Sequence, residues 1–184
     1  METNTTVSRT KLILMWGGIM GAVIYLISFI GRTANLDGAP AWGLASFLLS
    51  VAVVATCMGL AVRTWRDKGL GGFISFGKAF NTAFLTGLFA TVLMCLLTVL
   101  VLSFMGDDFK QEMADRKTEE IAKMEDAGQS EEAIEMAEQM FDLFTSLPMI
   151  LAMIVVMYTI GSAVMALIIA AIYKKEDPNN FGLA

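Results

Sequence analysis

The sequence of 184 residues has no histidine, two cysteines and three prolines, and only 17% of its residues are charged. The absence of histidine removes both the commonest general base and the commonest transition-metal ligand. Cys57 and Cys95 fall inside separate apolar stretches, where we expect buried hydrophobic side chains and no disulfide. Soluble domains carry about 25% charged residues. The low charge, with 56% hydrophobic residues, therefore indicates a membrane protein.

Four apolar stretches are long enough to cross a bilayer core of roughly 30 Å as helices that rise about 1.5 Å per residue. They cover residues 12–31, 41–62, 79–105 and 148–173. A cleaved signal peptide is the alternative for the first stretch. The only small-x-small pattern, at residues 39–41, lies well beyond that stretch and contains a proline, so we predict an uncleaved helix. The predicted fold is all-α: one integral membrane domain, residues 1–184, with four transmembrane helices in an antiparallel bundle.

An acidic insert, residues 106–147, separates the third stretch from the fourth. It contains thirteen acidic and four basic side chains, a net charge of −9, whereas the other residues contain five acidic and nine basic ones, a net charge of +4. Its composition favours helix. Ser130 is expected to cap a second helix that begins with Glu131 and Glu132. We predict a helical hairpin or a bent helix outside the hydrocarbon.

The distribution of lysine and arginine predicts the orientation in the membrane. Basic residues number two before the first span, four within residues 63–78 and two after the last span, but only one within residues 31–40. With an even number of spans, the three basic segments share one side. Cytoplasmic N- and C-termini and an insert on the outer side follow. The expected cytoplasmic basic anchors are Arg63, Arg66, Lys68, Lys78, Lys174 and Lys175.

Small residues recur at steps of four in the apolar stretches, and such stripes let helix backbones approach closely within lipid. The third stretch has this stripe beside a ridge of phenylalanines. Tyr25, Asn81 and Tyr158 are polar side chains within the spans, and Asn81 is the strongest candidate for a hydrogen bond between helices, worth roughly 1 kcal/mol. The expected helix-packing residues are Gly17, Gly21, Ala79, Ala83, Gly87, Thr91, Ser162, Ala166 and Ala170.

Three segments carry a resemblance to a known family: SFGKAF at residues 75–80, EMAEQMFDLFTSLP at 135–148 and IGSAVMALIIAAIYKKEDP at 160–178. Together they resemble the bacterial domain-of-unknown-function 4199 family of small four-helix integral membrane proteins. The resemblance covers residues 11–178. It implies a four-span bacterial membrane protein with unassigned activity, and it supplies no catalytic or binding residues.

Methionine offers the sharpest chemical hypothesis, because Met149, Met153 and Met157 recur every four residues in the last span. Thioether sulfur is a soft ligand suited to Cu(I). The alternative is that methionine fills gaps in a membrane bundle. No external methionine-rich or histidine-rich segment supports metal capture, so we predict no metal site and no cofactor, and keep these three residues as the soft-metal candidates.

The spans contain no deep Asp, Glu, Lys or Arg, which argues against proton-coupled transporters and pumps. Without histidine no nucleophile–base pair can be assembled, so we predict that the protein is not an enzyme. The acidic surface argues against nucleic acid as a partner. The expected partners are the lipid bilayer and either another membrane protein or further copies of this chain.

Two functions from different classes follow. The first is a non-enzymatic structural or interaction component of a bacterial cytoplasmic membrane. The second is a permeation component for a small solute or Cu(I) that acts as an oligomer, because four helices with little polar lining offer no obvious aqueous path. Convergence of Tyr25, Ser50, Asn81 and Tyr158 on one cavity would favour the second function.

Overall fold

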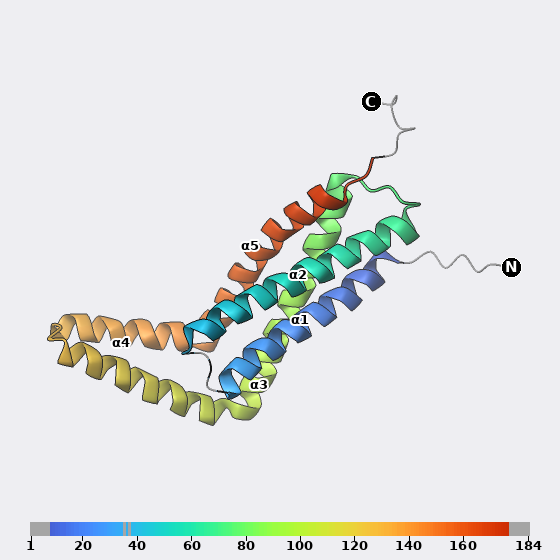
Figure 1. Ribbon diagram of the computed structural model, residues 1–184. Helices are drawn as coiled ribbons and strands as arrows, with labels where there is room; N and C mark the ends of the chain where they lie inside the picture. Colours follow the sequence, from blue (N-terminus) through green and yellow to red (C-terminus); the bar gives the residue numbers. More distant parts are fainter. Residues whose placement is uncertain (1–7, 35, 37, 177–184) are drawn as a thin grey trace. The chain divides into compact units, whose positions relative to one another are not determined.

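The computed structural model describes residues 8–34, 36 and 38–176, and these residues form five helices (Figure 1). The described chain contains no strand, only an isolated bridge between Ile74 and Lys175. Four of the helices are long and apolar enough to cross a membrane: α1, α2, α3 and α5. The all-α class and the four candidate spans are therefore confirmed. The helices are α1 (Arg9–Thr33), α2 (Pro40–Gly69), α3 (Phe76–Asp126), α4 (Glu131–Thr145) and α5 (Leu147–Tyr173).

The chain divides into two compact units. The first contains the described residues up to Met94 together with those from Met157 onward, and the second contains residues 95–156. Helices α3 and α5 each contribute one part to each unit. The expected single membrane domain stays a prediction. The expected N-terminal leader and C-terminal tail lie largely outside the described residues.

The boundary of α2 corrects one expectation from the sequence. The second apolar stretch was expected to end at residue 62, but α2 continues to Gly69, so Arg63, Arg66 and Lys68 lie on its last two turns. Lysine and arginine interrupt an apolar stretch of sequence, but the helix continues through them because both residues are good helix formers. Lys78 lies in the first turn of α3.

The true connection between α2 and α3 is short, residues 70–75. Gly71 and Gly72 have φ angles of 66° and 95°, in the left-handed region that glycine adopts without strain. Asp67 supports the preceding helix end, since its carboxylate lies 2.7 Å from Arg66 Nε and 3.7 Å from Arg63 Nε. The hydrogen bond from Arg66 lowers the pKa of Asp67 below its usual value.

A local break divides α3 at Met105, whose φ and ψ are −113° and 18°. The helical residues after this break and α4 form the two long arms of the second unit (Figure 1). Gly128, at φ 72°, makes the turn between the arms. The hydroxyl of Ser130 accepts a hydrogen bond of 3.3 Å from the Ala133 amide, which confirms the predicted N-cap of α4.

Small residues form much of the interior of the first unit. Ala79 and Ala83 of α3 and Ala166 of α5 are fully buried. Many large apolar side chains point outward, and those of Leu44 and Phe47 on α2 are both 63% exposed. This is the distribution expected of membrane helices, where small residues allow close packing and bulky ones meet lipid.

Candidate functional site

A close contact between three helices of the first unit lies at Gly87 of α3. A Cβ atom at Gly87 would lie 2.6 Å from Ser162 Cβ of α5 and 2.6 Å from Met58 Cε of α2. Real Cβ atoms do not approach other atoms that closely, so only glycine fits at this position. Helices α2, α3 and α5 therefore meet at Gly87, where the side chain is a single hydrogen atom.

A second close contact joins α1 to α3. A Cβ atom at Gly17 would lie 2.7 Å from the backbone oxygen of Thr86, and one at Gly21 would lie 3.0 Å from that of Ala90. The GxxxG pair therefore packs directly on the backbone of α3. Gly18, the neighbour of Gly17, has only an aromatic ring edge of Phe89 at 3.9 Å and is not constrained in this way.

All nine residues that the sequence marks for helix packing are buried. Four of them, spaced at four residues, line one face of α3, and three more, also spaced at four, line one face of α5. Thr91 donates a hydrogen bond of 3.0 Å to the Gly87 carbonyl, so its polar group is satisfied within its own helix. The structure thus places these residues in the interior, where small side chains permit close helix contacts.

Arg9 connects three helices at one end of the first unit. Its Nε donates a hydrogen bond of 3.2 Å to the Thr82 hydroxyl, and its Nη2 donates one to Asn81 Oδ1. Its guanidinium also lies 5.1 Å from the centre of the Trp65 ring, a cation–π distance. The start of α1, the end of α2 and the start of α3 are thereby held together, and Asn81 binds an arginine there.

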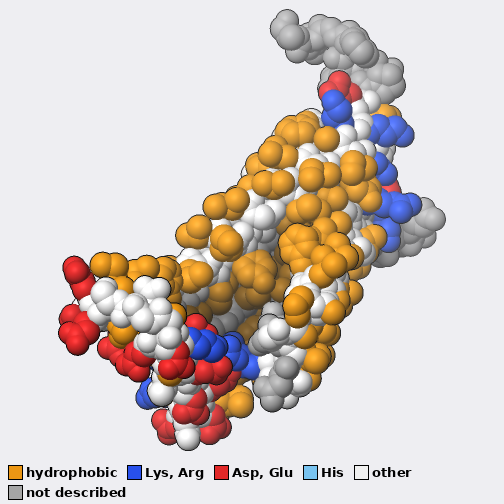
Figure 2. Space-filling model, turned by 60° about the vertical axis from the view of Figure 1, so that its left-hand side comes forward, with side chains coloured by type: hydrophobic (Ala, Val, Ile, Leu, Met, Phe, Trp, Pro, Cys, Tyr) orange, Lys and Arg blue, Asp and Glu red, His pale blue; other side chains and the backbone are white. Residues whose placement is uncertain are grey.

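Further contacts bring the end of α5 to the same end of this unit. Ile74 and Lys175 exchange two backbone hydrogen bonds of 2.8 and 2.9 Å. Arg66 lies 5.8 Å from the ring centre of Tyr173, and the Lys175 ammonium lies 5.4 Å from that of Phe73. Lysine and arginine side chains gather around this end (Figure 2). The basic residues here are Arg9, Lys11 and the six expected anchors Arg63, Arg66, Lys68, Lys78, Lys174 and Lys175.

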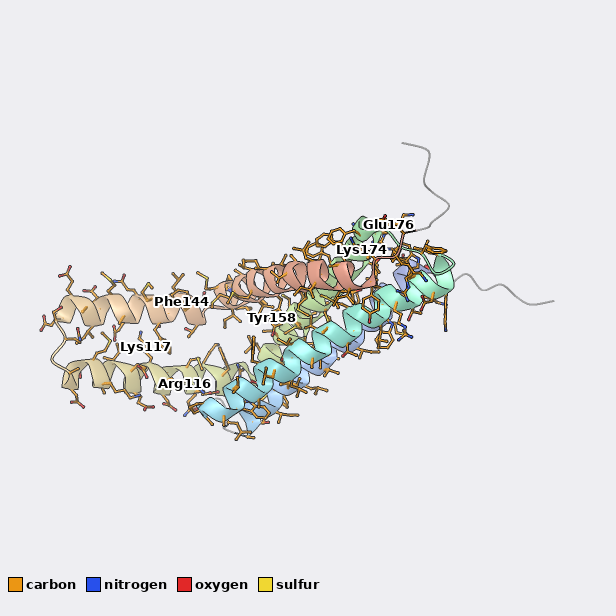
Figure 3. The ribbon with its side chains drawn as sticks, turned by 45° about the horizontal axis from the view of Figure 1, so that its top comes forward. Arg116, Lys117, Phe144, Tyr158, Lys174 and Glu176 are labelled. Atoms are coloured by element: carbon orange, nitrogen blue, oxygen red, sulfur yellow. The ribbon has the colours of Figure 1, made fainter. Side chains whose placement is uncertain are left out.

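A cavity of about 600 Å³ lies between α1, α2 and α5, entirely within the first unit. Its size is typical of a small-molecule pocket. Tyr158 of α5 projects into the space between α5 and α2 (Figure 3). The polar lining residues come from all three helices: Ser28, Arg32, Trp42, Ser46, Ser50, Tyr158 and Ser162. The apolar ones are Ile24, Ile27, Phe47, Val51, Val54, Met157 and Met165.

The hydroxyl groups in the cavity fall into two kinds. Ser28 donates to the Ile24 carbonyl at 3.3 Å and Ser46 to the Gly43 carbonyl at 3.2 Å, so their protons are used within their own helices. The hydroxyls of Ser50 and Tyr158 have no hydrogen bond to any other described residue, whereas the hydroxyl oxygen of Ser162 lies against Gly87 of α3. The cavity therefore presents hydrogen-bond donors to whatever occupies it.

The structure brings together only part of the polar set that the sequence marks. Ser50 and Tyr158 share the cavity, Asn81 binds Arg9 at the basic end, and Tyr25 is not among the lining residues. Among the methionines, Met153 is 46% and Met157 68% exposed. Both cysteines are free, with Cys57 buried and Cys95 half-buried.

The second unit has one ion pair between its two arms. Lys117 Nζ of α3 lies 3.0 and 2.9 Å from the two carboxylate oxygens of Asp142 on α4, and Lys117 lies between the arms (Figure 3). This hydrogen bonding raises the pKa of Lys117 above its usual value. Hydrogen bonds that the Lys123 ammonium donates to Glu119 and Glu120 likewise raise the pKa of Lys123. Acidic side chains gather on the face of this unit that is seen in Figure 2, beside apolar and basic ones.

An apolar stripe runs along the exposed face of α4. It consists of Met136, Met140, Leu143 and Phe144, which are 62%, 49%, 51% and 43% exposed. These residues follow the i, i+4, i+7, i+8 spacing of one helix face. An exposed apolar surface rimmed by polar groups marks an interaction site.

Sequence reasoning missed Arg9 as a connector and Arg32 as a cavity residue. Both were counted only as charges that set the orientation. Their positions were the available signal: Arg9 lies in the first turn of the apolar helix α1, and Arg32 lies in its last turn. Ser46 and Ser50 of α2 are four residues apart in the sequence, the spacing of one helix face, but Ser28 of α1 has no such partner.

The four candidate spans define the chain as a multi-pass membrane protein. The chain belongs to the family described as "Protein of unknown function (DUF4199)", whose model matches residues 15–175. The matched region includes nearly all of the five helices, which confirms the resemblance expected from the sequence. No curated protein and no solved structure matches the chain.

Proposed function

We propose that the protein is a non-enzymatic interaction component of a bacterial cytoplasmic membrane. In this proposal the four spans form an antiparallel bundle, and the acidic arms 106–126 and 131–145 form a hairpin on the outer side. The hairpin binds a protein partner with a basic surface and an apolar centre. The observation that carries the proposal is the exposed apolar stripe of α4 within an acidic surface.

The orientation is supported by the basic end of the first unit. The contacts of Arg9 and of Lys175 gather the start of α1, the end of α2, the start of α3 and the end of α5 at one end. Consecutive helices that meet in this way alternate in direction. The eight basic residues there favour the cytoplasmic face under the positive-inside rule. The C-terminal basic residues and the start of α1 then lie on the cytoplasmic side.

The partner's chemistry follows from charge. Residues 106–147 carry a net charge of −9, and their local ion pairs, such as that of Lys117 with Asp142, neutralise only a few of the carboxylates. A basic partner surface would be steered toward this field, and the partner's apolar centre would cover the α4 stripe. A membrane surface is the less suitable occupant, because anionic lipid headgroups would be repelled.

The alternative, permeation by an oligomer, has weaker support. Asn81 is used by Arg9 away from the cavity, and the sequence offers no histidine and no ionisable residue deep in a span. The lack of histidine also favours the non-enzymatic assignment, because the spans then offer no general base to activate a nucleophile.

Site-specific photo-crosslinking in native membranes tests the proposal. A photoreactive amino acid at Met140, within the apolar stripe, should give one discrete protein adduct. The matched control at Glu138, on another face of α4, should give little. The adduct should weaken at high salt, because screening reduces attraction between exposed charges. An adduct with lipid alone, or with a second copy of this chain, would contradict the proposed partner.

A further inference from the structure

The cavity between α1, α2 and α5 has a graded lining. Arg32 and Trp42 lie at the helix ends near the 31–40 connection, whereas Ile24 and Val54 lie eight or more residues deeper along their helices. Eight helical residues correspond to about 12 Å. One leaflet of a bilayer core is roughly 15 Å thick. The cavity therefore extends from one membrane interface through most of one leaflet.

The chemistry changes along this depth. Arg32 provides the cavity's one formal positive charge among the described lining residues, and it lies at the interfacial end. The serine hydroxyls and Tyr158 follow, and side chains such as Val54 and Met165 line the deeper part. A ligand that matches this order has an anionic head, hydrogen-bond acceptors next to it and a hydrocarbon tail.

The unpaired hydroxyls strengthen the assignment. Ser50 and Tyr158 make no hydrogen bond to the described chain, and unsatisfied polar groups within a membrane are costly. A head group with carboxylate or phosphate oxygens would accept from them, and charge-assisted bonds of this type are the strong ones. A purely apolar occupant would leave them unsatisfied.

We infer that this cavity binds an anionic amphiphile with a single hydrocarbon chain, its carboxylate or phosphate at Arg32 and its chain toward Val54 and Met165. A fatty acid and a lysophospholipid share this chemistry. The inference concerns the first unit alone and does not depend on the partner proposed for the hairpin. It assigns the cavity a binding role that packing of the four helices does not require.

Trp42 lines the cavity, so its fluorescence provides the test. The full-length protein in detergent is titrated with a brominated fatty acid, a brominated lysophosphatidic acid and a brominated long-chain alcohol. Trp42→Phe identifies the part of the quenching that arises in the cavity. We expect saturable quenching by at least one of the two anionic probes, with the neutral alcohol binding about tenfold more weakly. The relative affinity of the two anionic probes distinguishes the carboxylate from the phosphate source.

Two variants locate the ligand. Gly161 lines the cavity, and a Cβ atom there meets nothing within 4 Å, so Gly161→Phe should place its ring in the cavity and abolish binding. Ile160→Phe is the matched control, because Ile160 is 58% exposed and does not line the cavity. Arg32→Gln should weaken the anionic probes about tenfold and leave the alcohol unchanged.

Each result decides for or against the inference. Equal binding of the alcohol and the anionic probes in the unsubstituted protein would overturn the anionic assignment. Undiminished binding by Gly161→Phe would overturn the location. If Gly161→Phe fails to fold, the comparison of Arg32→Gln with the unsubstituted protein still decides, since an unchanged preference for anionic probes would contradict the role of Arg32.

Discussion

Gly87 of α3 and Ser162 of α5 lie so close that a methyl group on Gly87 would come within 2.6 Å of Ser162 Cβ. Ser162 is only 6% exposed, and Met58 of α2 covers the same position. The contact explains why a small residue is needed on both helices. Packing of this kind supplies much of the association energy within lipid, where the hydrophobic difference between helix and surroundings vanishes.

Gly87→Ala should destabilise the protein by about 1–3 kcal/mol, because the added methyl group overpacks a contact between three helices. Gly161→Ala is the control: it lies in α5 with open space around its Cβ position, and alanine favours helix by up to about 1 kcal/mol. Thermal unfolding in detergent measures both. Equal midpoints for the two variants would show that the close contact at Gly87 does not contribute to stability in detergent.

Gly17→Ala should destabilise the contact of α1 with α3, since its methyl group would meet the Thr86 carbonyl, a backbone atom that cannot turn away. A loss of about 1–3 kcal/mol is expected. The adjacent Gly18→Ala is a close control, with its nearest neighbour at an ordinary 3.9 Å. A Gly18 variant as unstable as the Gly17 variant would mean that the effect comes from helix geometry and not from the contact.

Arg9→Ala should loosen the basic end by removing hydrogen bonds to Asn81 and Thr82 and the contact with Trp65. In a double-mutant cycle with Asn81→Ala, we expect a coupling of roughly 0.5–1.5 kcal/mol, the usual net worth of a hydrogen bond. Lys11→Ala, an exposed neighbour, should change stability by less than about 0.5 kcal/mol. Strictly additive effects of the Arg9 and Asn81 variants would contradict the pairing.

The ion pair of Lys117 with Asp142 predicts a pH dependence of the second unit. Hydrogen bonding raises the pKa of Lys117 above its usual 10.5, so the stabilising contribution is fully present below pH 10.5 and is lost as the pH rises through the raised value. Spin labels at Asp115 and Gln139 should report a narrow distance distribution between the arms up to about pH 10, and a broader one above.

Lys117→Met provides the control for this titration, since it removes the ammonium and keeps a long side chain. Its distance distribution should be broader at neutral pH and should lack the part of the alkaline transition that Lys117 causes. Lys123 also has a raised pKa and is present in both proteins. An identical alkaline transition in the two proteins would assign the effect to Lys123 or to another group.

The proposed orientation can be tested at Ser130, in the turn between the arms. In intact cells, Ser130→Cys should react with a membrane-impermeant thiol reagent. The control is a Lys68→Cys variant at the basic end, which should react only after permeabilisation. Both variants are made with Cys57 and Cys95 replaced by alanine, so that the new thiol is the only one. The reverse pattern would invert the topology.

Much of the architecture could be predicted because it depends on local pattern. Apolar runs of sufficient length predicted four spans, and the Ser130 cap with Glu131 and Glu132 after it predicted where α4 begins. The end of α2 could not be predicted from hydropathy. Arg63, Arg66 and Lys68 leave the apolar pattern, yet they continue the helix, since helix propensity and membrane burial are different properties.

The sequence by itself determined the helices, the charge separation and the small-residue stripes, because each is a property of neighbouring positions on one helix. Only the tertiary structure decided which stripe meets which backbone, that Asn81 pairs with Arg9, and that serines from three helices share a cavity with Arg32. Those outcomes depend on the rotation and level of each helix against its neighbours. Spacing along one chain does not specify them, because many rotations bury similar apolar area and only close packing distinguishes among them.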